Sequence, residues 1–161
     1  MPSFDKEGPV TLSVLDRLID KEPDRTQEPP MSRAQSVREL RAALRRDLEW
    51  LFNTRCTIEE APDSLFEVQH SVYNYGVPDT TSLYLKSTRD QEYLGKAIKA
   101  AITTFEPRLQ AVKVAIEANT DTVRGIHFTI EGLMRMDPAP EPVFFDTLLE
   151  PSKGEYRVKS T

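Results

Sequence analysis

The hydrophobic period of this chain changes at Pro107. Before Pro107, apolar residues recur at steps of three and four, the spacing of amphipathic helices. After it, they alternate with polar residues, as in half-buried strands. Because proline cannot continue a helix and biases the preceding residue away from the helical region, the change of period also marks a change of structure. The sequence therefore predicts an α+β fold, with N-terminal helices packed on a C-terminal antiparallel β-meander.

Three helices are expected before Pro107. The first begins at Ser36, whose hydroxyl can cap the first turn while Glu39 reaches back to complete a capping box, and it ends near Thr54. A shorter helix is expected over 63–75 and another over 88–105. The apolar faces of the first and third helices are formed by Val37, Leu40, Leu44, Leu48 and Leu51, and by Leu94, Ala97, Ile98, Ala101, Ile102 and Phe105.

Four strands are expected after Pro107, over 112–116, 126–136, 143–149 and 155–158. A short antiparallel sheet leaves unpaired N–H and C=O groups along its edges, and such an edge accepts an added strand from a partner. The stretches Val143–Leu149 and Glu155–Val158 are the expected edges. Tyr156 is the residue whose backbone we expect to take part in this pairing.

The first 35 residues have the composition of a linker, since five of the 12 prolines lie in the first thirty residues. Within them, Leu12, Leu15, Leu18 and Ile19 recur at helical spacing. A helix of one or two turns is not stable alone in water, so this apolar face must dock on the body of the protein or on a partner. We expect a flexible leader over 1–35 and one α+β domain over 36–161.

The charge balance and the cysteine content exclude several classes of protein. The 161 residues carry 21 Lys and Arg against 26 Asp and Glu, a net charge of −5, which opposes non-specific binding to nucleic acid. No apolar run approaches the roughly 18 residues of a membrane span, and the N-terminus does not resemble a secretory signal. The lone Cys56 excludes an internal disulfide. A cytoplasmic location is therefore expected.

The sequence offers few residues for catalysis. His70 and His127 lack companions at metal-ligand spacing, and the glycines are too scattered for a phosphate loop. The carboxylates of Glu59 and Glu60 are adjacent and point in different directions, whereas a glycosidase pair must face across a cleft. No catalytic residue, no metal and no cofactor is expected.

A row of basic residues, Arg38, Arg41 and Arg45, follows one side of the first predicted helix. The simpler interpretation is a solvated face with ion pairs to Asp47 and Glu49. The alternative is a docking surface for an acidic partner. A regulatory or nucleic-acid-binding module using this row is a third possibility, which the acidic total opposes.

An ordered set of segments resembles a known family. The set comprises Leu15–Asp20, the helix over 37–55 with its Arg-Asp-Leu-Glu and Asn-Thr-Arg stretches, the pair Tyr75–Gly76, and Phe105–Leu109 with its Glu-Pro-Arg motif. Together they resemble the TssE family. TssE is a type VI secretion baseplate subunit, related to the small wedge protein of contractile phage tails and often labelled lysozyme-like.

The resemblance implies a non-catalytic wedge subunit that joins the baseplate to the first ring of the contractile sheath. Its implied partners are the baseplate subunits TssF, TssG and TssK and the sheath subunits TssB and TssC, at the cytoplasmic side of the inner membrane. The family label also suggests an alternative, a muramidase-like peptidoglycan hydrolase.

The Glu-Pro-Arg motif maps onto Glu106, Pro107 and Arg108, which the resemblance associates with assembly contacts. A rigid bend at Pro107 would set the acid and the base on either side of a corner, where Arg108 can offer a planar fork to a carboxylate. Such a bond can join a partner or brace the corner internally. From the sequence we expect this corner to matter more for assembly than for folding.

Limited proteolysis of the free chain tests the leader prediction. We expect the first cleavages before Ser32, because proline-rich polar sequence there flanks one short apolar face. Mass spectrometry of the early fragments locates the cleavage sites. Full protection of this segment in the free monomer would contradict the prediction.

Overall fold

The computed structural model describes residues 8–19, 23–24, 30–57, 61–62, 64–81, 83–84, 87–117, 125–150 and 154–160. Predictions that concern Glu59, Glu60 and the rest of the leader lie outside these residues. The chain divides into two compact units, 1–44 and 45–161. Helix α2, Arg33–Asn53, begins in the first unit and ends in the second.

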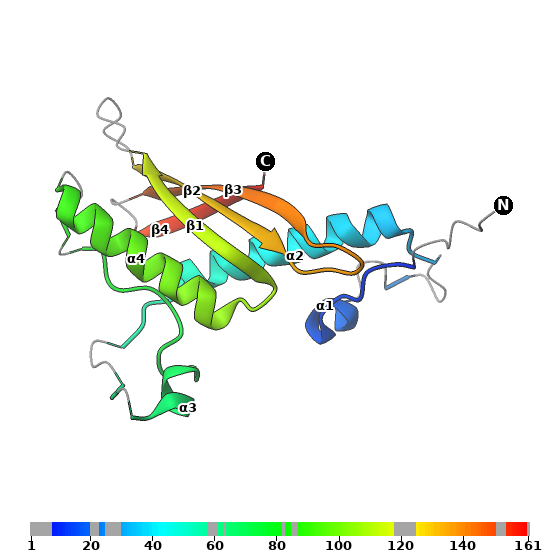
Figure 1. Cartoon of the computed structure of the whole chain (residues 1–161), viewed down its shortest axis with the longest axis horizontal. Helices are drawn as coiled ribbons and strands as arrows, with labels where there is room; N and C mark the ends of the chain where they lie inside the picture. Colours follow the sequence, from blue (N-terminus) through cyan, green and yellow to red (C-terminus); the bar gives the residue numbers. More distant parts are fainter. Residues whose placement is uncertain are drawn as a thin grey trace. The chain divides into compact units, whose positions relative to one another are not determined.

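The second unit contains an antiparallel sheet of four strands in the order β1-β2-β3-β4. Figure 1 shows the strands following one another as a meander after α4. The predicted α+β fold is confirmed, and each predicted strand is present with slightly different ends. The strands are β1 Leu109–Glu117, β2 Ile126–Met134, β3 Glu141–Glu150 and β4 Glu155–Ser160.

One face of the sheet forms the core of this unit. Strand positions alternate between buried and more exposed residues, as expected for a sheet covered on one side. An aromatic cluster joins α2 to the sheet, with the Phe52 ring centroid 6.0 Å from Phe128 and 5.8 Å from Tyr156. The largest fully buried side chains of the unit are Leu48, Leu51, Phe52, Leu94, Ile98, Ile102, Phe128, Ile130, Met134, Phe145 and Leu149.

Helix α4, Thr88–Phe105, has the predicted bounds. The Ser87 hydroxyl accepts a hydrogen bond from the Asp90 N–H and so caps the first turn. The helix ends before Glu106, because Pro107 disfavours a helical conformation for the residue that precedes it. Leu94, Ile98, Ala101 and Ile102 are buried along one side, as the periodicity predicts.

Helix α2 begins at Arg33, so the prediction that Ser36 caps it is wrong. Ser32 takes that place, since its hydroxyl accepts from the Gln35 N–H. Ser36 lies inside the helix and is fully buried. Its hydroxyl donates to the Arg33 carbonyl and accepts from the Val10 N–H, at 2.9 Å. A serine near a helix start can therefore bind an incoming segment instead of capping.

The predicted helix over 63–75 is reduced to α3, Phe66–Gln69. The Ser71 hydroxyl donates to the Val68 carbonyl and accepts from the Tyr73 N–H, which replaces the helical pattern by a turn. The chain then passes close to the end of α2 at Gly76, which has φ 122°. A Cβ there would lie 2.3 Å from the Thr54 carbonyl oxygen, so only glycine fits.

The first unit contains α1, Val14–Leu18, capped by Ser13. Leu15, Leu18 and Ile19 are exposed and Leu12 is half-buried. The described part of the leader is instead joined to α2 by polar bonds, from the Val10 N–H to Ser36 and from Arg33 to the Gly8 carbonyl. Polar bonds therefore contribute to holding this segment on α2, and its ordering through the apolar face stays a prediction. A partner contact by Leu12, Leu15 and Leu18 stays a prediction.

The two expected sheet edges have different outcomes. Val143–Leu149 lies within β3, which pairs with β2 on one side and β4 on the other, so the prediction that it forms an edge is wrong. Strand β4 is an edge strand, but side chains of α2 form hydrogen bonds with the backbone groups on its outer side. Asn53 accepts from the Tyr156 N–H at 2.8 Å and donates to the Tyr156 carbonyl at 2.9 Å. Arg45 donates to the Val158 carbonyl at 3.3 Å.

Asn53→Ala tests the contribution of this pair of bonds to folding. Loss of both hydrogen bonds to Tyr156 should lower the free energy of unfolding by about 1 to 2 kcal/mol, measured by urea denaturation followed by circular dichroism. Asn53→Leu is the matched control for side-chain bulk and should show a similar loss. An unchanged stability in both variants would contradict this assignment.

Candidate assembly site

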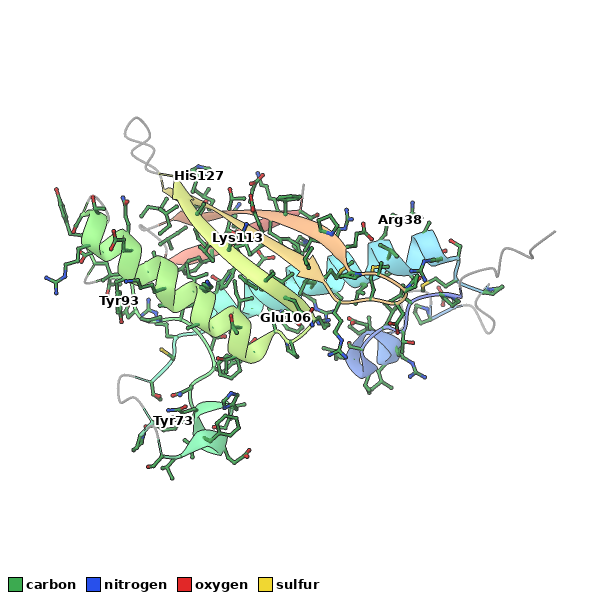
Figure 2. All side chains as sticks on the ribbon, viewed as in Figure 1. Arg38, Tyr73, Tyr93, Glu106, Lys113 and His127 are labelled. Atoms are coloured by element: carbon green, nitrogen blue, oxygen red, sulfur yellow. The ribbon has the colours of Figure 1, made fainter. Side chains whose placement is uncertain are left out.

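The Glu-Pro-Arg motif forms the corner between α4 and the sheet. Glu106 caps the C-terminus of α4, with its N–H donating to the Ile102 carbonyl, and β1 starts at Leu109. Figure 2 shows Glu106 at the end of the sheet where α4 gives way to β1. The Leu109 N–H donates to the Glu106 carbonyl, which closes the turn around the exposed Pro107. Backbone and proline together fix the direction in which Arg108 leaves the chain.

Arg108 binds two carboxylates with its guanidinium. Its Nε donates to Glu106 Oε1 at 2.6 Å, and its Nη2 donates to Glu106 Oε2 and to Asp47 Oδ2, both at 2.5 Å. The hydrogen bonds to Glu106 are the main cause that raises the pKa of the Arg108 guanidinium above its ordinary value. Glu106 is only 5% exposed, so the pair is largely removed from water. This bidentate geometry is one that lysine cannot reproduce.

The ion pairs continue along the part of α2 that belongs to the second unit. The other carboxylate oxygen of Asp47, Oδ1, accepts from Arg46 Nε at 2.8 Å. The guanidinium of Arg46 in turn lies 4.8 Å from the centroid of the Trp50 ring, a cation–π distance. We call Arg46, Asp47, Glu106 and Arg108 the corner network. It joins α2, the end of α4 and the start of β1.

Tyr75 lies beside the corner network. Burial raises the pKa of its hydroxyl, and the nearby charges of Asp47 and Glu106 raise it further. Its ring packs edge-to-face on Phe105 at 5.3 Å. Tyr75 and Asp47 are not among the site residues predicted from the sequence. The only signals were the Tyr75–Gly76 pair and the position of Asp47 in the Arg-Asp-Leu-Glu stretch.

The other predicted site residues do not belong to the corner network. Arg38 is exposed and Arg41 half-buried, whereas Arg45 pairs with Glu49 at 3.1 Å, as the simpler interpretation of the basic row expects for this residue. Tyr156 is buried in β4, and burial raises its pKa to about 12. Partner contacts by these residues stay predictions.

No group of three or more His, Cys, Asp or Glu residues that could hold a metal ion occurs among the residues that the structure describes. His70 stacks on Phe66 at 4.1 Å, and its Nδ1 lies 2.9 Å from the Phe66 carbonyl oxygen. Within the same described ranges, no helix has the length and apolar character needed to cross a membrane.

Comparison with known families identifies the class of protein. Residues 38–139, which include the second part of α2, the corner and β1 and β2, match a family profile of phage-tail-like baseplates. The chain belongs to this family, whose description is baseplate wedge protein gp25. The resemblance found in the sequence is thereby confirmed at family level, and it implies assembly with other baseplate components. Searches of curated proteins and of solved structures each found no significant match.

Arg108→Ala tests the corner network. The contacts are internal, so this variant would leave Glu106 buried without its main partner and should lower the free energy of unfolding by about 3 kcal/mol. This loss replaces the modest effect on folding that the sequence alone led us to expect. Arg108→Lys keeps the charge without the fork and should recover only part of the stability in chemical denaturation.

A second measurement distinguishes a purely internal role of the corner network from a role in contacting a partner. Co-purification with baseplate partners should be compared for Arg108→Ala and for Asn53→Ala, which also weakens folding but at a distance from the corner network. A loss of assembly in both variants, in proportion to their stability, supports a purely internal brace. A loss confined to Arg108→Ala supports an added partner contact at the corner.

Proposed function

We propose that this chain is a structural, non-catalytic wedge subunit of a type VI secretion baseplate and joins the wedge to the first ring of the contractile sheath. Its proposed partners are the baseplate subunits TssF, TssG and TssK and the sheath subunits TssB and TssC. The proposed location is the cytoplasmic side of the inner membrane.

The family match over residues 38–139 is the observation that carries the proposal. It supports a baseplate role, and the choice of a type VI apparatus rests on the ordered motifs from Leu15 to Leu109 that resemble TssE. The match includes all four residues of the corner network. The matched range therefore contains the place where helix and sheet are joined by charged contacts.

The geometry of the second unit is suited to an assembly role. A wedge subunit must hold its binding surfaces at fixed angles, and the corner network fixes α2, α4 and β1 to one another through short charge-assisted bonds. The sheet that follows this corner presents backbone groups at its margin, where strands of other proteins can pair.

The alternative function, a peptidoglycan hydrolase, needs two carboxylates that face a substrate across a cleft. Asp47 and Glu106 are two acids that lie together in the described part of the chain, and both are bonded to the same Arg108 guanidinium. This arrangement is that of a structural ion pair, which supports the non-catalytic assignment. Incubation of purified chain with peptidoglycan, followed by analysis of released fragments, tests the alternative directly.

Removal of the chain from the assembled apparatus tests the sheath link. Wedges lacking this chain should still contain TssF, TssG and TssK but should fail to nucleate sheath from TssB and TssC, as counted by electron microscopy. Returning the unmodified chain is the control and should restore nucleation. Sheath that forms equally well without the chain would exclude the proposed role.

A further inference from the structure

The side of α4 opposite its buried residues is basic. Arg89, Lys96 and Lys99 are exposed there. Within the described part of the chain, no hydrogen bond or ion pair joins any of these three side chains to another residue. Glu92 is exposed on the same side and is also unpaired, so three cations lie with one free acid. This side of the helix therefore carries positive charge that the fold itself does not neutralise.

Arginines elsewhere in the second unit have acidic partners. Arg45, the one member of the predicted basic row that lies in this unit, is 3.1 Å from Glu49, and Arg108 is held by Glu106. The chain as a whole carries a net charge of −5. A group of unpaired cations on one helix is therefore a local exception to both the pairing and the overall charge of the protein. The basic surface lies on α4 and not on the helix where the sequence suggested it.

Two exposed tyrosines accompany these cations. Tyr93 is 51% exposed and follows Arg89 by one helical turn, and Figure 2 shows it on the side of α4 that is turned away from the sheet. Tyr84 is 66% exposed and is held at the start of α4, because its N–H donates to Asp90 Oδ2 at 2.9 Å. Tyrosine and arginine are enriched at protein interfaces, where they supply much of the binding energy. We call Tyr84, Arg89, Tyr93, Lys96 and Lys99 the α4 face.

The helix sets the spacing of the charges on the α4 face. Arg89 and Lys96 are two turns apart, which places them about 10 Å from each other along the helix axis, and Lys99 lies one turn further on. The rings of the two tyrosines occupy the part of the face nearer the start of the helix. A partner that fits this surface needs at least two carboxylates about 10 Å apart and an apolar area beside them.

We propose that the α4 face binds an acidic surface of a neighbouring wedge subunit of the baseplate. The assignment rests on the proposed function and names a contact other than the sheath link. Membership of the baseplate wedge family implies assembly with other baseplate components. A protein is favoured over nucleic acid, because the net charge of −5 repels a phosphate backbone over its whole length. Carboxylates that touch the α4 face meet unpaired cations within one Debye length, about 8 Å.

Charge reversal tests the α4 face. The double variant Lys96→Glu with Lys99→Glu reverses two of its charges without removing a described contact of the fold. Lys113→Glu is the matched control, because Lys113 is also exposed and unpaired but lies on the other side of β1 from Val114 and Ile116, which face α4. Figure 2 labels Lys113 on β1. Binding of each chain to immobilised complexes of TssF, TssG and TssK is measured at low and at high salt.

We expect the double variant to weaken binding about tenfold at low salt and Lys113→Glu to weaken it less than about twofold. Binding of the unmodified chain should fall as salt rises, because salt screens charges that are exposed to solvent. Thermal denaturation should show that all these chains are equally folded. Equal binding by the double variant and the unmodified chain would overturn the inference, and so would equal losses in the double variant and in Lys113→Glu.

Tyr93→Ala and Tyr93→Phe test the aromatic part of the face. The alanine variant should weaken binding about tenfold at every salt concentration, because it removes contact area and no charge. The phenylalanine variant keeps the ring and should bind nearly as well as the unmodified chain. Normal binding by Tyr93→Ala would exclude the tyrosine from the contact and would overturn the α4 face as defined.

Carbodiimide coupling of assembled wedges identifies the partner without any substitution. The reagent joins a lysine amine to a carboxylate in contact with it, with loss of water, and mass spectrometry locates the amide that forms. Products that join Lys96 or Lys99 to an acid of another wedge subunit would support the inference. Products that join them only to a second copy of this chain would overturn it. Binding of DNA that the double variant abolishes would also overturn it.

Failure of this inference and failure of the proposed function give different results. Normal binding by the double variant, together with loss of sheath nucleation when the chain is removed, would overturn the α4 contact alone. Nucleation by baseplates that lack the chain would remove the proposed sheath link. Binding of the α4 face to the wedge subunits could still be measured in that case, because it does not depend on sheath.

Discussion

The bidentate bond between Arg108 and Glu106 is the interaction on which the arrangement of the second unit depends. The two residues are separated only by Pro107, which already restricts the bend. The same guanidinium also donates a hydrogen bond to Asp47 on α2. Helix α2, which is distant in sequence, and the junction between α4 and β1 thus meet at one guanidinium. Because Glu106 is almost fully buried, the network cannot lose one member without leaving another desolvated and poorly paired. A sheet attached at such a corner keeps its orientation when a neighbour binds.

The two edges of the sheet have different environments, because different helices lie beside them. Helix α2 reaches β4 with Asn53 and Arg45, which bond to its outer backbone, whereas α4 borders β1 with a glycine and leaves a groove. The difference arises from single side chains, since both helices contribute buried apolar residues to the same core. Helix packing therefore stabilises the unit. A few residues, polar ones in α2 and a glycine in α4, determine which edge strand is available to a partner.

Much of this fold was predictable from the sequence, for identifiable reasons. The bounds of α4 followed from its apolar period and from Pro107, and the strands followed from strict alternation. The start of α2 was not predictable, because Ser32 and Ser36 are both chemically able to cap and only Val10, far along the chain, decides between them. The helix before Gly76 was shorter than predicted because the Ser71 hydroxyl bonds Val68 and Tyr73 in a turn, which the apolar period does not record. Of the site, the motif at 106–108 could be recognised in the sequence. The contribution of Asp47 could not, because it depends on how α2 packs beside the corner.

The bonds from Asn53 to Tyr156 bear on how far copies of this chain can associate. An indefinite ribbon needs two usable margins on every sheet, because each unit must both accept a strand and present one. A sheet with only one usable margin can pair with its own copy once, about a two-fold axis, and the pair is then closed. The hydrogen bonds from Asn53 and Arg45 to the outer side of β4 thus oppose open-ended pairing of sheets from copy to copy.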